Sequence, residues 1–459
     1  MNKDTRIKKI TEIIEGKEEP LGRIEIPWKD ALVAMNYYKI PLEYLIYNKF
    51  NGRILSRTKS LESHDHEINA EMKEGEAIID KLLWESKEDR NKQTLESIKS
   101  HGQEKVGIIT RDGIIIDGNR RAMLLKRSGD YDYFKAVVLP VTLENDPLEI
   151  EKLETIYQMG EDEKLGYNPI EKYLKARGLK QKGVAEDKIA SWMGEDVSAI
   201  KSWLSIMDTM DDYLEYLKYN KIYTQLDGRE DQFINLNKWL SNFYGENSAK
   251  GFDGYKDSDV DDLKTISYDY IRIKFEGKRF RKIADGLKGK HIFGDKAIWV
   301  DFREKHIKNV DPIKDSEDQI DYNSENLKRH LDDRDEKFSG QAEPLLNENL
   351  ELHCEQLGNK EAAGKPINLI SKAISAIDAI DQRHKAFAAP EVLEKIEDLN
   401  KITASMLKEK SPKRIFSSVI KLLESVEFKN AIDEKSDLLS GIKDVQRIAY
   451  QVEKDIKDL

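Results

Sequence analysis

The chain has 459 residues, 36% of them charged and 39% hydrophobic, and its formal net charge is −11 at pH 7. This length allows roughly two to four domains with buried cores. The acidic balance excludes a protein that coats nucleic acid indiscriminately, so any DNA contact must be a local basic patch. The single cysteine, Cys354, excludes an intramolecular disulfide and is typical of a reducing cytoplasm.

We expect a cytoplasmic protein without a membrane partner. No apolar stretch approaches the roughly 18 residues of a membrane span. The first twelve residues lack the hydrophobic core of a signal peptide. Residues 1–24 are expected to form a short amphipathic helix followed by a charged turn.

The segment Ser56–Lys92 is rich in His, Glu and Lys, and we expect an insertion or a surface helix there. Within it, His64, Asp65, His66 and Glu67 resemble a metal site. Histidines two residues apart do not share a helical face, so a solvated loop is favoured.

The most informative stretch is 107–129. Asp112-Gly113 lies between two β-branched runs, a pattern typical of a hairpin. The second strand leads into Gly118-Asn119-Arg120-Arg121, and from Ala122 the residues favour a helix that Gly129 can close. Such a turn brings backbone N–H groups, the helix dipole and guanidinium groups together, which indicates an anion site. A structural turn whose arginines pair with nearby carboxylates explains the same residues equally well.

Several motifs in order resemble the ParB/sulfiredoxin superfamily over roughly residues 40–225. The segment 95–102 resembles the helix that precedes the first strand, and Gly118–Arg121 resembles the G-x-R-R nucleotide-binding box. A strand at Phe134–Leu139 follows, as in that superfamily. Tyr167–Glu171 is similar to the L-N-P-I/L-E segment that opens the helix-turn-helix region of ParB proteins, and Tyr47–Ile54 weakly resembles the N-P-R segment.

The resemblance implies that a nucleoside triphosphate, CTP or ATP, binds with Mg²⁺ at Gly118, Asn119, Arg120, Arg121 and Lys164. Asn119 replaces the sulfiredoxin cysteine, which excludes sulfinic-acid reductase activity. The ParB E-N-x-x-R box is assigned to 160–164, where Lys164 takes the place of the arginine. Glu161 and Glu163 are candidate Mg²⁺ ligands, because hard cations prefer oxygen. An acidic surface loop is the alternative.

Residues 151–225 are expected to form a helix-turn-helix-like helical domain. Asn168 caps one helix, and Gly194 separates a helix at 186–193 from one at 197–207. On the second helix the buried stripe is Ile200, Trp203, Leu204 and Met207. The outward, DNA-facing residues are then Ser198, Lys201, Ser202 and Ser205. Segment 164–224 carries ten basic and nine acidic residues, which indicates weak or nonspecific DNA contact. The alternative is a helical subdomain that packs on the nucleotide-binding fold.

Residues 226–310 are expected to form a mixed basic domain, with a strand at Tyr268–Phe275. Between 271 and 309, twelve Lys and Arg face five Asp and Glu. The candidate DNA-backbone contacts are Lys278, Arg279, Arg281 and Lys282, and a solvated face is the alternative. Interleaved aromatic residues suit base stacking as well as core packing: Phe275, Phe280, His291 and Phe293.

The fold class that follows is α+β. A ParB/sulfiredoxin-like nucleotide-binding domain at 25–150 precedes the helix-turn-helix and mixed domains. Then come a charged linker at 311–345 and a C-terminal helical bundle at 346–459, whose apolar stripes suit dimerisation.

We hypothesise a ParB-like DNA-binding protein whose nucleotide state gates DNA engagement, in plasmid maintenance or phage defence, as a homodimer through its C-terminal helices. One alternative is an enzyme of the same fold, a nuclease or an ATP-dependent phosphotransferase with Asp117 or Glu161 as base. Another is a scaffold for a partner ATPase. The residues leave enzymatic activity open.

Overall fold

The structure is a computed structural model. It describes residues 1–16, 19–63, 67–162, 168–245, 248–322, 327–361, 365–408, 412–424 and 435–458. The chain divides into two units, Met1–Ala363 and Gly364–Leu459, which are described separately. In the described part of the chain, no helix is both long and apolar enough to cross a membrane.

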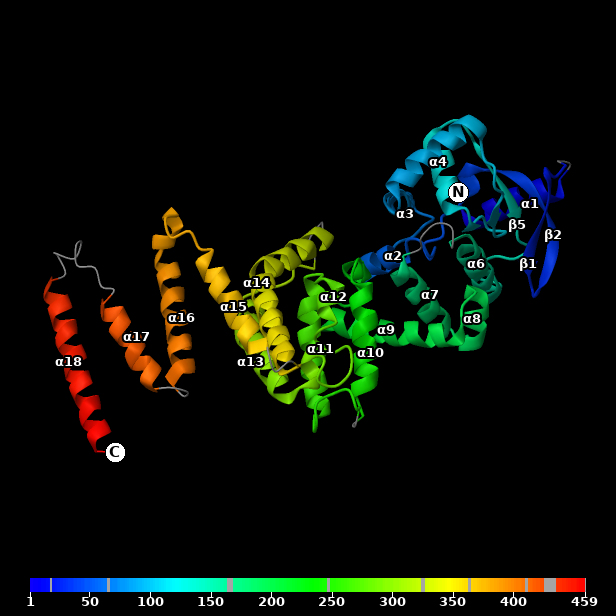
Figure 1. The fold of residues 1–459 in the computed structure, drawn as a ribbon. Helices are drawn as coiled ribbons and strands as arrows, with labels where there is room; N and C mark the ends of the chain where they lie inside the picture. The colour runs from blue at the N-terminus through cyan, green and yellow to red at the C-terminus, as the bar shows by residue number, and fades with distance from the viewer. Residues whose placement is uncertain are drawn as a thin grey trace. The chain divides into compact units, whose positions relative to one another are not determined.

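The first unit begins with a five-stranded mixed sheet of order β1-β2-β5-β3-β4, of which β1, β2 and β5 are labelled in Figure 1. The strands are β1 (Gly22–Trp28), β2 (Ala31–Pro41), β3 (Gly107–Ile109), β4 (Ile115–Asp117) and β5 (Tyr133–Val138). Among the strands that the structure describes, β3 and β5 pair in parallel and the other pairs are antiparallel. Lys29 and Asp30 join β1 to β2 with positive φ at both residues, which matches the twist of a hairpin. The sheet confirms the α+β expectation.

Helices cover both faces of this sheet. One face is covered by α1 (Lys3–Glu15), α3 (Lys73–Glu85), α4 (Glu88–His101) and α5 (Asn119–Ser128), whose apolar residues share a core with Ile109 and Phe134. On the other face α6 (Pro147–Asp162) packs Ile150 and Leu153 against Ile108 and Val137. The β4–α5 connection therefore lies between two layers of helices.

The segment 56–92 is largely helical, in agreement with the surface-helix expectation, but its helices also contribute residues to the core. It contains α2 (Leu55–Glu62), α3 and the start of α4, and both Ile79 and Leu83 of α3 are fully buried. The many charged residues around Ile79 and Leu83 make the segment polar on average, so its composition does not reveal this apolar stripe. His64, Asp65 and His66 lie outside the described residues.

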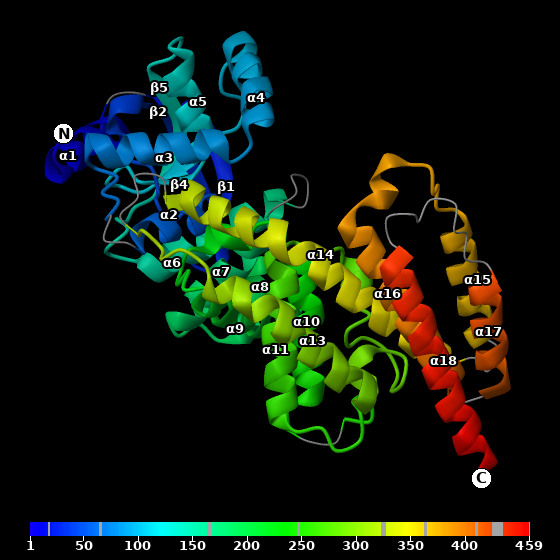
Figure 2. The same cartoon turned by 90° about the vertical axis from the view of Figure 1, so that its left-hand side faces the viewer.

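The rest of the first unit is helical in its described residues (Figure 2). The helices are α7 (Pro169–Gln181), α8 (Glu186–Met193), α9 (Val197–Tyr216), α10 (Glu230–Phe243), α11 (Asp257–Arg272), α12 (Gly277–Phe280), α13 (Lys296–Asp315) and α14 (Leu327–Glu361). A small core joins α7, α8 and the start of α9, and a larger core includes residues of α2 and α7 and runs from α9 to α14. This larger core is continuous across the boundaries expected at 225 and 310.

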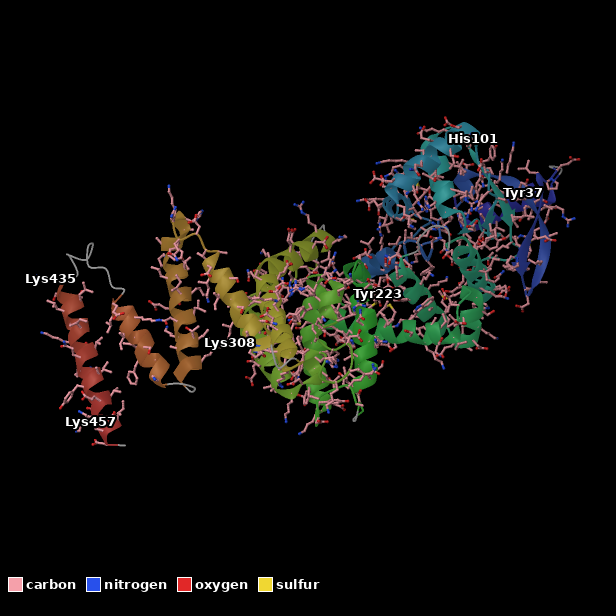
Figure 3. All side chains as sticks on the ribbon, viewed as in Figure 1. Tyr37, His101, Tyr223, Lys308, Lys435 and Lys457 are labelled. Atoms are coloured by element: carbon pink, nitrogen blue, oxygen red, sulfur yellow. The ribbon has the colours of Figure 1, made fainter. Side chains whose placement is uncertain are left out.

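The short 3₁₀ helix η2 (Tyr223–Leu226) connects this helical part to α2. Tyr223 is labelled in Figure 3, and the backbone N–H of the next residue, Thr224, donates to Ser60 Oγ at 3.2 Å. Further 3₁₀ helices are η1 (Leu42–Tyr44) and η3 (Ile292–Gly294).

Two expectations for this region are wrong. Residues 268–272 of the strand expected at Tyr268–Phe275 lie in α11, where every residue from Ile266 to Arg272 is buried. A helical segment that is buried on all sides does not show apolar residues at a 3.6-residue period. The alternation of apolar and polar residues over Tyr268–Phe275 therefore arose by chance. The expected linker at 311–345 is largely α13 and α14, and Leu331, Phe338 and Ala342 of α14 are buried in the core.

The second unit is helical in its described residues, as expected. Its elements are α15 (Lys365–Asp378), η4 (Lys385–Ala388), α16 (Pro390–Lys408), α17 (Pro412–Glu424) and α18 (Lys435–Lys457). Figure 3 labels the first and last residues of α18, Lys435 and Lys457. Large apolar side chains remain exposed along α15, including Ile367, Ile370 and Ile374.

Candidate functional site

The strand–turn–helix at 115–128 forms as the sequence predicts. Gly118 has φ 101° and ψ 20°, and a Cβ at this position would lie 2.7 Å from Cζ of Phe134. Only glycine satisfies both the backbone conformation and the space. Helix α5 begins at the next residue and ends at Gly129, which has φ 71°. The N-terminus of α5 therefore lies at a fixed point beside β4.

A cleft of about 430 Å³ opens at this N-terminus, and we name it the arginine cleft. Its lining comes from the 51–53 loop, α4, the β4–α5 turn, α5 and α6. The lining residues are Asn51, Arg53, Arg90, Gln93, Thr94, Asp117, Gly118, Asn119, Arg120, Arg121, Leu124, Tyr157 and Gln158. Four are arginines and one is a carboxylate, so the lining has a strong excess of positive charge. Fork-shaped guanidinium groups beside a helix N-terminus suit phosphate oxygens.

The two arginines of the motif have different roles. Arg121 Nη2 contacts Asp117 Oδ2 at 2.5 Å, and its Nη1 donates to the carbonyl oxygens of Lys105 and Val106 at 2.7 and 3.1 Å. The structural alternative, an arginine paired with a carboxylate, thus holds for Arg121. Asp117 is engaged in this ion pair, which favours a positioning role over that of a catalytic base.

Arg120 is held on the cleft wall by a buried amide. Its Nε donates to Asn91 Oδ1 at 2.8 Å. Asn91 is completely buried, and its Nδ2 donates to the carbonyl oxygens of Leu83 and Trp84, at the end of α3. The α3–α4 corner therefore positions Arg120.

Asn119 lines the cleft, but its amide holds the turn together. Its Oδ1 accepts from the backbone N–H of Asn48 at 2.9 Å, and its Nδ2 donates to the Ile115 carbonyl oxygen at 3.0 Å. The side chain is 2% exposed. The resemblance implied that Asn119 contacts the nucleotide, whereas both ends of its amide make hydrogen bonds within the protein.

Helix α6 supplies cleft residues that the sequence analysis missed, namely Tyr157 and Gln158. Gln158 Nε2 donates to Glu154 Oε1 at 2.7 Å, one helical turn earlier. Glu154 is buried; Asn48 Nδ2 also donates to it at 3.1 Å, and Lys175 Nζ of α7 at 3.2 Å. Burial raises the pKa of Glu154, and the neighbouring Lys175 opposes that rise. The i, i+4 spacing of Glu154 and Gln158 is the local signal that the sequence offers for this contact.

The structure does not place the candidate Mg²⁺ ligands Glu161 and Glu163 at the arginine cleft. Glu163 and Lys164 lie outside the described residues, and for Glu161 only the backbone, at the end of α6, is described. Over the described ranges, no group of three or more His, Cys, Asp or Glu side chains could hold a metal ion. The weak N-P-R match does reach the cleft, through Asn51 and Arg53.

Helices α8 and α9 are separated by a glycine turn, at the position that the sequence predicts. Gly194 closes α8 with φ 68° and ψ 30°, and α9 begins three residues later. Ile200 and Met207 are buried, while Trp203 and Leu204 are half-buried. Ser198, Lys201 and Ser202 are exposed as predicted. Ser205 is half-buried, and its Oγ donates to Asn237 Oδ1 of α10 at 2.8 Å, so it belongs to a helix contact.

The basic segment after α11 is only partly a surface. Lys278, Arg281 and Lys282 are exposed, but Arg279 donates to Asn347 Oδ1 at 2.7 Å and to Glu351 Oε1 at 2.9 Å on α14. The interleaved aromatic residues are buried in the larger core, which rules out the base-stacking role: Phe275, Phe280, His291 and Phe293.

Comparisons with known proteins give weak similarities. No protein-family model and no curated protein matches the sequence. One similar solved structure is the C-terminally truncated chromosome-partitioning protein ParB from Caulobacter crescentus complexed to the centromeric parS site. It is 12% identical, with 54% of this chain and 98% of that chain covered and a TM-score of 0.28. The same protein complexed with CTP-γ-S is 14% identical, with 44% and 92% covered and a TM-score of 0.18. TM-scores this low do not establish a common fold.

Proposed function

We propose that this protein binds a nucleoside triphosphate in the arginine cleft. The observation that carries the proposal is the convergence of Arg53, Arg90, Arg120 and Arg121 at the N-terminus of α5. Because Arg121 is largely occupied within the protein, Arg120 is the motif arginine that we assign to the phosphates. CTP and ATP are the candidate ligands. We keep Glu161 and Glu163 as candidate Mg²⁺ ligands.

We propose DNA as the second ligand, bound at the exposed start of α9. Ser198, Lys201 and Ser202 form the face that a major groove would meet, and Lys278, Arg281 and Lys282 are a second, basic contact. The nucleotide state would gate this engagement, since α6 contacts both the cleft and α7. Plasmid maintenance or phage defence is the setting that we propose for such a switch.

We further propose that the second unit makes the protein a homodimer. Its helices expose apolar side chains at helical spacing, including Ile370, Ile374 and Ile377 of α15 and Leu399 and Ile402 of α16. A monomer rarely leaves such a continuous apolar surface in water. A partner ATPase is the alternative occupant of the same surface.

Calorimetric titration with CTP, ATP and GTP, each with Mg²⁺, tests the nucleotide proposal. We expect one of the three to bind, and the change Arg120→Ala to weaken binding by about tenfold or more, the effect of losing a charge-assisted hydrogen bond. The matched control is Arg23→Ala, which removes an arginine from β1 that donates to the Ala34 carbonyl oxygen, outside the cleft lining.

Repeating the titration with duplex DNA tests the gating. A nucleotide affinity that changes when DNA is present supports two linked sites, because linkage is reciprocal. If none of the three nucleotides binds, or if Arg120→Ala binds like the unchanged protein, the nucleotide proposal is wrong.

A further inference from the structure

One face of helix α6 connects the arginine cleft to α7. Glu151, Glu154 and Gln158 recur at i, i+3 and i+7, so they lie in a row along the helix. Gln158 lines the cleft. Lys175 of α7 contacts Glu154 at 3.2 Å and Glu151 at 3.6 Å, and Lys182 at the end of α7 also donates to Glu151. Polar contacts therefore run without a break from the cleft to the first helix of the α7–α9 group.

In the side-chain amide of Gln158, the nitrogen makes a hydrogen bond within the described part of the chain and the oxygen does not. Its nitrogen faces Glu154, because a carboxylate accepts and only the nitrogen of the amide can donate. Its oxygen, Oε1, is buried and has no hydrogen-bond partner among the described residues. Gln158 as a whole is 5% exposed. Buried carbonyl oxygens are nearly always paired, so this one is suited to a donor that a ligand brings.

The chemistry of a nucleotide identifies that donor. Ionised phosphate oxygens only accept hydrogen bonds, whereas ribose hydroxyls and exocyclic base amines donate. The arginines therefore suit the phosphates, and Gln158 Oε1 suits the nucleoside.

A movement of Gln158 would be transmitted to α7 through the ion pair of Glu154 and Lys175, which is shielded from water. Both Glu154 and Lys175 are buried, and Glu154 uses Oε1 for Gln158 and Asn48 and Oε2 for Lys175. The residue after Lys175, Ala176, lies in the small core shared with α8 and α9. A shift of the pair would displace that core.

We infer that Gln158 accepts a hydrogen bond from the nucleoside part of the ligand, and that the Glu154–Lys175 pair transmits this contact to α7–α9. Gln158 is then a specificity residue and Lys175 a positioning residue. The inference rests on the proposed nucleotide binding.

Hydrogen exchange of the full-length protein tests the inference, measured with CTP, with ATP and with inorganic triphosphate, each saturating and with Mg²⁺. We expect inorganic triphosphate to protect amides of α4 and α5 only, because it lacks a donor for Gln158. The nucleotide that binds should protect α7–α9 in addition. This comparison needs no variant and is independent of any folding defect.

Two variants separate the steps. Gln158→Met should weaken the nucleotide by about tenfold and leave inorganic triphosphate within about threefold. Lys175→Met should keep nucleotide affinity within about threefold but lose the protection of α7–α9. Lys180→Met is the matched control, since Lys180 is an exposed lysine of α7 that pairs with Glu186 of α8.

The possible outcomes are distinct. If neither CTP nor ATP binds, the proposed nucleotide function fails, and the inference with it. If a nucleotide binds but α7–α9 respond equally to inorganic triphosphate, or respond normally in Lys175→Met, only the inference is overturned.

Discussion

The adjacent residues Arg120 and Arg121 should rank in opposite order in stability and in binding. Removing Arg121 loses an ion pair with Asp117 and two hydrogen bonds to carbonyl oxygens. We expect Arg121→Ala to lower the free energy of unfolding by about 1–3 kcal/mol. Arg120→Ala removes the hydrogen bond to Asn91 Oδ1, and we expect it to cost less stability than Arg121→Ala but more nucleotide affinity. Urea unfolding and calorimetry on both variants check this, and the same ranking in both measurements would contradict it.

Glu171 should make stability depend on pH. Its carboxylate accepts from the Ser56 N–H and hydroxyl, which caps α2, and burial raises its pKa to about 7 from 4.5. A raised carboxyl pKa stabilises the fold below pH 4.5, and that stability is lost as pH rises through 7. The loss approaches about 3 kcal/mol by pH 8.

The variant Glu171→Gln isolates this effect. An amide can accept from the Ser56 N–H and donate to its hydroxyl, so both contacts survive without titration. We therefore expect the difference in unfolding free energy between the variant and the unchanged protein to grow in favour of the variant from pH 5 to pH 8. A difference that stays constant over this range would refute the assignment.

At the scale of elements, sequence was informative where local chemistry determines the conformation. The turn at Gly118 and the cap at Asn168 depend on residues that are neighbours in the chain. In contrast, the segment Ile266–Arg272 of α11 is buried on every side, so its pattern no longer distinguishes helix from strand. Gln158 and Glu154 of α6 were missed because only the fold brings them beside Asn48 and Lys175. Tertiary contacts, unlike turns, leave little local signal.

Helices α7 to α9 contain two glycines whose substitution should have opposite effects on stability. Gly194 has φ 68° and Gly178 lies inside α7, and in both cases an added Cβ meets nothing within 4 Å. Backbone conformation alone then decides the outcome. We expect Gly194→Ala to lower the free energy of unfolding by about 1 kcal/mol and Gly178→Ala to raise it by a similar amount.

Thermal and urea unfolding of the two variants measure this pair. Gly194→Asn is the control, since asparagine tolerates the left-handed conformation better than alanine and should cost less. Equal effects at Gly194 and Gly178 would contradict the assigned turn.

At the scale of the whole molecule, the two units differ in how they bury apolar residues. The first unit has continuous cores, from the sheet to α14. In the second unit, α15–α18 each leave large apolar side chains exposed, among them Ile374, Leu399, Val419 and Ile448. The sequence predicted helices here correctly. It also predicted dimerisation, because burying these exposed apolar side chains against a second copy would remove them from water.

The dimer proposal predicts that charges on the apolar stripe of α15 separate the protomers. Ile370→Asp combined with Ile374→Asp places two carboxylates one helical turn apart on exposed apolar positions. We expect sedimentation to show a shift from dimer to monomer, because a carboxylate buried without a partner at an interface is strongly unfavourable. The matched control is Ser371→Asp with Ser375→Asp, which adds the same charges at the same spacing on exposed polar positions of the same helix. The control should remain dimeric and both proteins should keep their nucleotide affinity. Equal dissociation of both would indicate general charge repulsion, and a monomeric starting protein would leave the stripe to another partner.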